Sequence, residues 1–170
     1  MDCIKMVVTM NPCKCGFYPD MNRCTCTAAE VHRYLGKISQ PLLDRMDISI
    51  EAEELAYGQL VSGGENEPSS AVRERVMRAH EVQKERYRGT GIHFNSDLTV
   101  EGIREYCALG EEENQMLEKA FKKLHMSARG YHRLLKVART IADMEGSSRI
   151  LCTHIGEAVC YRSVENRFRV

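Results

Sequence analysis

The sequence has no excess of either charge, because 24 lysine and arginine residues balance 24 aspartate and glutamate residues. This balance excludes a general electrostatic attraction to nucleic acid or acidic lipid, although it is compatible with a local basic face. No apolar run approaches the roughly 20 residues that a transmembrane helix needs. The apolar stretch near the N-terminus is too short, and has the wrong flanks, for a signal peptide. These absences predict a cytoplasmic chain with no membrane partner.

Two motifs of phosphate-binding proteins are also missing. The loop G-x-x-x-x-G-K-[ST], whose backbone N–H groups surround phosphates, occurs nowhere in the chain. No pair of acidic residues follows an apolar segment, as the Mg²⁺ ligands of such proteins do. The chain therefore lacks the residues that hold phosphates and Mg²⁺ in P-loop enzymes.

The first 62 residues predict part of an α/β domain. Residues 4–10 are apolar and stop at residues 11–12, Asn-Pro, as a buried strand followed by a turn does. Residues 48–51 alternate as a half-buried strand does. Between them, residues 27–30 have the pattern of a capping box, which predicts a helix to about Lys37. A buried strand with no preceding element is typical of a fragment, so we expect a truncated piece of a larger α/β core.

The remainder, residues 68–165, predicts an all-helical domain. A polar linker at residues 63–68 gives the clearest domain boundary. Apolar residues at helical spacing, together with capping residues, predict five helices. Three of them are expected at residues 69–87, 99–107 and 153–161. The other two include residues 117–124 and residues 134–141, and the second of these is expected to end at Gly146. The expected fold class is therefore mainly α, with a truncated α/β piece followed by a helical domain.

Four of the eight cysteines are close together in the sequence. The pairs Cys13-x-Cys15 and Cys24-x-Cys26 are separated by eight turn-forming residues, which can fold the second pair onto the first. Four thiolates complete a tetrahedral Zn²⁺ site of the closed, structural kind. However, Cys-x-Cys is less usual than Cys-x-x-Cys in such sites. A reduced or partly oxidised loop and a redox role are therefore alternatives.

Three polar residues are candidates for binding an anion, although each alone has an ordinary explanation. Asn11 follows the first predicted strand, where open α/β sheets place ligands, but Asn-Pro also simply forms turns. Arg45, between Asp44 and Asp47 on a turn begun by proline, has the planar group that suits phosphate. A surface ion pair would have the same pattern. Arg129 begins a helix with three further basic residues at helical spacing, as a solvated basic face would.

Taken in order, these stretches resemble one family. VVTMNPC, CGFY, CTCT and RYLGKISQPLLDRMDI, followed by SARGYHRLLKVARTIADMEGS, are similar to the C-terminal part of the magnesium-chelatase-like AAA+ ATPases of bacteria. The resemblance runs from about Ile4 to about Arg162 and rests on two separate motifs and the cysteine insertion. It points to the ComM/YifB subfamily, linked to competence and DNA recombination. Magnesium-chelatase subunits proper share the two motifs without the cysteine loop.

The resemblance implies a role for each candidate residue. Asn11 matches sensor 1, which orients the attacking water near the γ-phosphate. Arg45 matches the arginine finger, which reaches the ATP of a neighbouring subunit. Arg129 matches sensor 2, which couples the bound nucleotide to the angle of a helical lid and, in this group of proteins, can also act across the subunit interface. Arg133 and Arg139 are expected to be structural or DNA-facing.

The resemblance also implies cofactors and partners. ATP and Mg²⁺ would bind to the longer parent protein, and a structural Zn²⁺ would bind to the cysteines of this chain. The parent would be a homo-oligomer, expected to be a hexamer, that acts on DNA by branch migration or as a helicase. Without the phosphate-binding motifs, this chain alone is expected not to hydrolyse ATP. Two other functions stay open: the ATPase subunit of a magnesium chelatase for tetrapyrroles, and a zinc-stabilised helical module that binds nucleic acid without ATP.

The charge of the first predicted lid helix gives mild support for DNA binding. Its basic residues outnumber its acidic residues. The basic residues are Arg73, Arg75, Arg78, Lys84, Arg86 and Arg88, and the acidic ones are Glu74, Glu81 and Glu85. A solvated helix face explains this pattern equally well.

Overall fold

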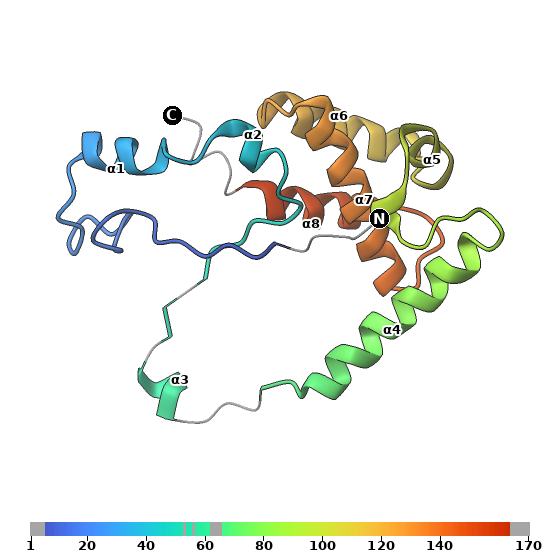
Figure 1. Ribbon diagram of the computed structural model, residues 1–170, viewed down its shortest axis with the longest axis horizontal. Helices are drawn as coiled ribbons and strands as arrows, with labels where there is room; N and C mark the ends of the chain where they lie inside the picture. The colour runs from blue at the N-terminus through green and yellow to red at the C-terminus, as the bar shows by residue number, and fades with distance from the viewer. Residues whose placement is uncertain (1–5, 53, 56, 62–65, 164–170) are drawn as a thin grey trace. The chain divides into compact units, whose positions relative to one another are not determined.

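The computed structural model describes residues 6–52, 54–55, 57–61 and 66–163. The described part of the chain forms two compact units, one up to Leu43 and one that begins at Asp44. No β-strand occurs among the described residues, and helices are the main regular structure (Figure 1). The predicted mainly α fold class is therefore confirmed. Of the predicted linker, residues 63–65 lie outside the described residues.

The first unit has two short helices after the cysteine-rich loop, α1 (Ala28–Leu35) and α2 (Gln40–Leu43). The predicted capping box opens α1. The backbone N–H of Thr27 donates to the Glu30 carboxylate over 2.9 Å, and the N–H of Glu30 donates to the Thr27 hydroxyl over 3.3 Å. The helix ends two residues before the predicted end, because a turn begins at Gly36.

The core of the first unit contains sulfur as well as hydrocarbon. Cys13, Val31 and Leu35 are buried and form one cluster. The partly buried side chains around them are Cys15, Tyr18, Cys24, Cys26 and Tyr34. So few apolar side chains bury little surface. Small units that bury so little apolar surface often need metal, disulfides or a partner to fold, so the sulfur atoms are central to this unit.

The two predicted strands are absent from the described residues, which corrects the expectation. Residues 6–10 have no regular structure and are exposed, Val7 by 91%. Residues 4–5 lie outside the described part of the chain. Residues 48–51 are also irregular, with Ile48 55% and Ile50 71% exposed. A strand needs neighbours for its backbone hydrogen bonds, and no described residue pairs with either segment in a β-ladder.

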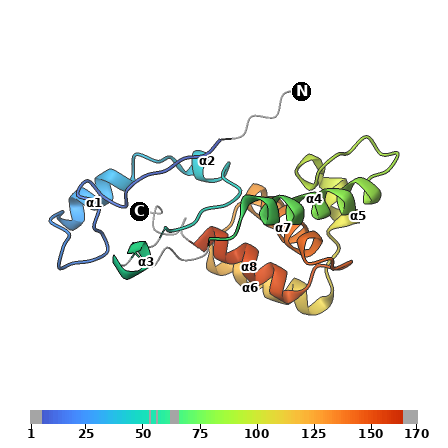
Figure 2. The ribbon, with the colours of Figure 1, turned by 90° about the horizontal axis from the view of Figure 1, so that it is seen from below.

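The second unit is a helical bundle centred on one helix, α7. Helices α4, α5 and α8 and the short 3₁₀ turn η1 pack against α7, and α6 packs against α8 (Figures 1 and 2). The elements of this unit are α3 (Tyr57–Val61), α4 (Ser69–Arg86), η1 (Asn95–Asp97), α5 (Val100–Tyr106), α6 (Glu111–Lys123), α7 (Ala128–Met144) and α8 (Cys152–Ser163). All five predicted helices are present, and the last begins at Cys152 rather than at Thr153.

One apolar cluster forms the core of the second unit. Leu134 and Ala138 of α7, Leu117 of α6 and Ile155 of α8 are each at most 2% exposed. Burying one leucine or isoleucine side chain contributes about 1.5–3 kcal/mol, so this cluster is a main source of stability. No helix in the described part of the chain is both long enough and apolar enough to span a membrane.

Helix α7 begins and ends at residues that the sequence marks as caps. The Ser127 hydroxyl accepts a hydrogen bond from the backbone N–H of Gly130 over 3.1 Å. At the other end, Gly146 has a φ of +73°, and the N–H of Ser147 donates to a carbonyl of the last turn over 2.8 Å. This is the Schellman arrangement, which favours glycine at the left-handed position. The prediction that Gly146 ends the helix is confirmed.

Candidate functional site

The four predicted zinc ligands come together in the first unit. The Sγ atoms of Cys13, Cys15, Cys24 and Cys26, here called the cysteine cluster, all lie within 4.8 Å of one another. Three of the Sγ–Sγ distances are 3.3, 3.6 and 3.8 Å. A disulfide bond is about 2.05 Å long, so these are separate thiols. Four sulfurs about 2.3 Å from one Zn²⁺ ion would lie roughly 3.8 Å apart, so the cluster has the size of a tetrahedral zinc site.

Tight turns bring the second cysteine pair back to the first. The N–H of Gly16 donates to the Cys13 carbonyl over 3.2 Å, and Gly16 has a φ of +87°, which glycine adopts without strain. The N–H of Cys24 donates to the Asp20 carbonyl over 2.8 Å. Because the backbone itself folds the loop, the short Cys-x-Cys spacing does not prevent the four thiols from converging.

The clustered thiols do not ionise independently. The backbone N–H of Phe17 lowers the pKa of the Cys15 thiol to about 5. The N–H of Cys26 lowers the pKa of Cys24, but burial and the sulfurs of Cys15 and Cys13 outweigh it and raise that pKa to about 12. Burial would raise the pKa of Cys13, but hydrogen bonds from the backbone N–H groups of Tyr18 and Gly16 outweigh it and lower that pKa. Cys13 and Cys15 therefore ionise more readily than Cys24 and Cys26, and the negative charge on Cys13 hinders ionisation of those two thiols. A divalent cation would remove this repulsion, so the donor set suits Zn²⁺.

Arg45 follows α2 at the start of the second unit, and its side chain is exposed. Its carbonyl accepts a hydrogen bond from Nη1 of Arg133, on α7, over 2.6 Å. The same nitrogen donates to the carboxylate of Asp47. The next carbonyl, that of Met46, accepts from Nη1 of Arg162, on α8, over 3.3 Å. The backbone around Arg45 is thus attached to two helices of the bundle.

Arg129 lies in the first turn of α7, one turn before Arg133, and is exposed. Residues four apart on a helix lie on the same face, so Arg129 and the backbone of Arg45 are presented by the same end of α7. Asn11 is exposed and belongs to the first unit, where its side chain lies beside Gly16. The structure therefore places Arg45 and Arg129 in the second unit and Asn11 in the first. Their roles toward ATP stay predictions.

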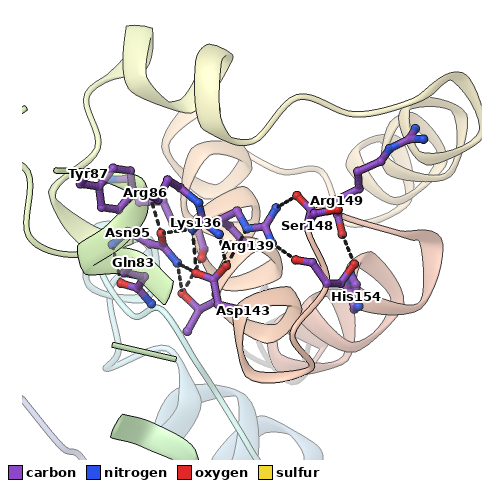
Figure 3. Close-up of polar contacts among 12 residues, drawn as sticks. Gln83, Arg86, Tyr87, Asn95, Lys136, Arg139, Asp143, Ser148, Arg149 and His154 are labelled. Atoms are coloured by element: carbon purple, nitrogen blue, oxygen red, sulfur yellow. Dashed lines mark hydrogen bonds and ion pairs between the residues drawn. The ribbon is translucent and has the colours of Figure 1, made fainter. Parts of the chain in front are cut away.

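A buried polar network, which the sequence analysis missed, fixes α7 in the bundle (Figure 3). Asp143 is 2% exposed and accepts from Nε of Arg139 over 3.0 Å. It also accepts from Nη1 of Arg86 over 2.8 Å and from Nδ2 of Asn95 over 2.9 Å. Arg139 further donates to two carbonyls just beyond the end of α7. A buried charge without a partner is strongly destabilising, so these residues depend on one another.

The network decides the role of Arg139. This side chain is 2% exposed, so Arg139 is structural and not DNA-facing. The pairing of Arg139 with Asp143 could have been predicted from the sequence, since residues four apart on a helix share a face. The other two donors to Asp143 could not be found in this way, because Arg86 and Asn95 precede it by 57 and 48 residues.

The groups of this network satisfy one another. Hydrogen bonding to Asp143 raises the pKa of Arg86, so the pair stays charged. The hydroxyl of Tyr87 donates to Oδ1 of Asn95 over 2.6 Å, and burial raises the pKa of Tyr87. Lys136 donates to a backbone carbonyl of η1 over 2.7 Å, and burial lowers its pKa. Such mutual pairing indicates a structural network rather than a binding site.

The basic excess on the first lid helix, α4, is largely balanced by nearby carboxylates. The ion pairs are Arg75–Glu67, Lys84–Glu81, Arg86–Asp143 and Arg88–Glu85. Arg73 and Arg78 are exposed and have no such pair in the described part of the chain. The helix therefore offers a smaller basic surface than its composition predicts.

Comparison with known proteins gives two family matches. Residues 66–162 match the family described as magnesium chelatase, subunit ChlI C-terminal, and residues 3–60 match the family described as magnesium chelatase, subunit ChlI. The competence protein ComM of Haemophilus influenzae is 40% identical over 161 residues, and YifB of Escherichia coli is 40% identical over 164 residues. These alignments cover 94% and 95% of this chain but 31% of each relative. The chain thus spans about a third of their length.

Proposed function

Because this chain belongs to the magnesium-chelatase family of AAA+ proteins, we propose that it supplies the arginine finger and the helical lid of an oligomeric, ATP-driven motor that acts on DNA. The ATP-binding site would lie between subunits of the longer protein. Mg²⁺, held by residues of the longer protein outside this chain, would neutralise part of the charge on the phosphates. This chain would contribute positive charge from its own side chains.

The main support for this proposal is that Arg45 and Arg129 belong to the same unit. Both side chains are exposed, and the hydrogen bond from Arg133 holds the Arg45 backbone on α7. Guanidinium groups bind phosphate oxygens in a bidentate manner, so two exposed ones on the same unit would suit a nucleotide. Arg45 would stabilise the charge on the transferred phosphoryl group, and Arg129 would tie the lid to the nucleotide. Asn11 would orient the attacking water.

DNA as the substrate is supported by relationship more than by charge. The H. influenzae relative is named a competence protein, and the chain resembles the competence-related subfamily. Arg73 and Arg78 on α4 add a small basic surface. The cysteine cluster favours this subfamily over a magnesium chelatase, whose subunits share the two motifs but not the cysteines.

We also propose that the cysteine cluster binds one structural Zn²⁺ ion. All four ligand positions of a tetrahedral site would be filled by thiolates, so no position is open for catalysis. The ion would link the two ends of the loop that follows Asn11 and would complete the small core around Val31 and Leu35. The role of zinc would be to hold this loop in one conformation.

ATP turnover by two proteins tests the motor proposal. The isolated chain is expected to show none, because it lacks the P-loop. A chimaera, in which this chain replaces the matched part of the H. influenzae relative, is expected to hydrolyse ATP faster when DNA is added. In the chimaera Arg45→Ala is expected to lower kcat by roughly 10³-fold, as loss of an arginine finger does. Arg104→Ala, at an exposed arginine of α5, is the matched control.

Four results would contradict parts of this proposal. Turnover by the isolated chain, or an unchanged kcat in the Arg45→Ala chimaera, would remove the proposed role of the finger. Stimulation by a porphyrin-binding partner but not by DNA would favour the chelatase. DNA binding by the isolated chain that needs no ATP and weakens steeply with salt would favour a nucleic-acid-binding module.

Elemental analysis of the purified chain tests the zinc proposal. About one zinc per chain is expected, because four thiolates fill one tetrahedral site. Serine substitution of Cys13, Cys15, Cys24 or Cys26 is expected to release the zinc. Cys160→Ser, at an exposed cysteine outside the cluster, is the control and should retain it. Freshly reduced protein without zinc would contradict the proposal.

A further inference from the structure

The backbone of residues 44–49, here called the finger segment, is held on two helices at three positions. The bonds are Arg133 Nη1 to the Arg45 carbonyl (2.6 Å), Arg162 Nη1 to the Met46 carbonyl (3.3 Å), and the Ser49 N–H to the Tyr161 carbonyl (2.8 Å). The segment has no strand or helix of its own beyond a turn. Its position in the second unit therefore depends on these contacts with α7 and α8.

Arg133 makes two contacts with the finger segment through one nitrogen. Its Nη1 donates to the Arg45 carbonyl and also to the Asp47 carboxylate. The side chains of Arg133 and Asp47 are 26% and 63% exposed, and an ion pair so exposed contributes little by itself. The additional bond to the carbonyl makes this pair different from an ordinary surface pair, because it fixes the backbone of the residue that matches the arginine finger.

Arg162 connects the finger segment to the turn that carries Arg129. It is 3% exposed, and a Cβ atom added at Gly130 would lie 3.4 Å from its guanidinium group. Gly130 directly follows Arg129 in the first turn of α7. The same buried guanidinium therefore lies against the first turn of α7 and binds the carbonyl that follows Arg45. The turn that carries Arg129 and the backbone at Arg45 are therefore both in contact with the same two helices, α7 and α8.

We propose that Arg133 and Asp47 form a positioning pair, which holds Arg45 in register with Arg129 so that both guanidinium groups reach the phosphates of one nucleotide. This inference rests on the proposed function of Arg45 and Arg129. Arg133 itself does not touch the nucleotide in this scheme. When the lid turns, the pair carries Arg45 with α7, so the finger moves together with sensor 2.

A direct contact between Arg133 and phosphate is the competing explanation, and Asp47→Asn separates the two. This change keeps every cation, removes one negative charge and weakens the contact between Arg133 and residue 47. If Arg133 bound phosphate directly, the variant would bind and hydrolyse ATP at least as well as the parent. If the pair positions Arg45, the variant loses activity although its charge has become more favourable for an anion.

The first experiment measures backbone hydrogen exchange in the 170-residue chain itself. Asp47→Asn and Arg133→Gln are each expected to raise the exchange rate of the Ser49 amide by about tenfold, because local opening of the finger segment becomes easier. Amides in the middle of α7 and α8 should be unchanged. Arg104→Gln is the matched control, since it removes an exposed arginine of α5. Unchanged exchange at Ser49 in both variants would overturn the positioning pair.

The second experiment measures ATP turnover in the chimaera described above. Asp47→Asn is expected to lower kcat by about 10- to 100-fold with little change in KM, since a small displacement of a catalytic group costs this much. Arg133→Lys keeps the charge and a nitrogen that can donate to two acceptors, but on a differently shaped side chain, and should avoid only part of the loss that Arg133→Gln causes. An unchanged or higher kcat in Asp47→Asn would overturn the inference.

The two experiments separate failure of the inference from failure of the proposed function. If Arg45→Ala leaves kcat unchanged, the proposed function is wrong, and the inference fails with it even where exchange at Ser49 responds. If Arg45→Ala abolishes turnover but Asp47→Asn does not affect it, the finger is established and the positioning pair is wrong.

Discussion

Arg139 and Asp143 lie one turn apart on α7, and Nε of Arg139 donates to the Asp143 carboxylate over 3.0 Å where both side chains are at most 3% exposed. Arg86 of α4 binds the same carboxylate from the other side. One buried anion thus joins two helices and the loop after α7. The lid of this protein is held together by this charge as well as by its apolar core.

Replacing the buried anion should unfold the lid more easily. Asp143→Asn leaves Arg86 and Arg139 buried without a counter-charge, and breaking such a pair costs about 3–5 kcal/mol of unfolding free energy. Urea denaturation followed by circular dichroism measures the change. Glu118→Gln is the control, because Glu118 pairs with Lys122 on an exposed surface where about 0.5 kcal/mol or less is expected. Equal, small changes in the two variants would show that the network is dispensable.

Acid should weaken the start of α1 through Glu30. The backbone N–H and the hydroxyl of Thr27 hold the pKa of Glu30 below its usual value of 4.5. The capping box therefore stabilises the helix fully above the pKa of the unfolded chain, and this stability is lost as the pH falls through the lower folded-state pKa. Amide chemical shifts of α1, followed from about pH 6 to about pH 3, report the transition. Glu30→Gln should abolish it, and a transition that persists in this variant would point to another group.

Thiol labelling should distinguish Cys107 from Cys160. Cys107 is 3% exposed, and burial raises the pKa of its thiol to about 11, so little thiolate is available near neutral pH. Cys160 is exposed. Mass spectrometry after brief iodoacetamide treatment is expected to find Cys107 modified at least about 100-fold more slowly than Cys160. In urea the two rates should converge. Rapid labelling of native Cys107 would show that the lid opens far more often than its packing indicates.

A single methyl group should destabilise the end of α7. Gly146 has a φ of +73° and open space around its Cα, so Gly146→Ala adds backbone strain without a clash. The expected loss is about 1 kcal/mol, the cost of a left-handed conformation for an L-residue. Thermal unfolding measures it. Gly156→Ala is the matched control, because Gly156 lies inside α8 and a Cβ there would make ordinary contact with the flexible Met116 side chain. An equal loss of stability in Gly156→Ala would show that the positive φ of Gly146 is not the cause of the loss.

Most of the correct predictions came from patterns among residues that are close together in the sequence. The capping box at Thr27 and the glycine that ends α7 act through neighbouring residues, so the sequence alone identified them. The convergence of the four cysteines also followed from a short loop with turn residues. The predicted strands were wrong because a strand depends on partners elsewhere in the fold, and an apolar pattern such as that of residues 6–10 does not supply them.

The features that escaped prediction join residues distant in the sequence. The bond from Arg133 to the carbonyl of Arg45 spans 88 residues, and that from Arg162 to Met46 spans 116. Either arginine alone has the pattern of a solvated helix face. Only the packing of α7 and α8 shows that these side chains face a backbone segment.

The sulfur-rich core of the first unit has a consequence for the cell. With Cys13, Val31 and Leu35 as its buried centre, this unit has little apolar area with which to offset the entropy of ordering its chain. If zinc binding supplies the missing stability, folding of this unit depends on the concentration of free zinc. Each tenfold rise in free zinc above the dissociation constant then adds about 1.4 kcal/mol to the stability of the unit. The fraction of chains with an ordered loop next to Asn11 would then report how much zinc is available.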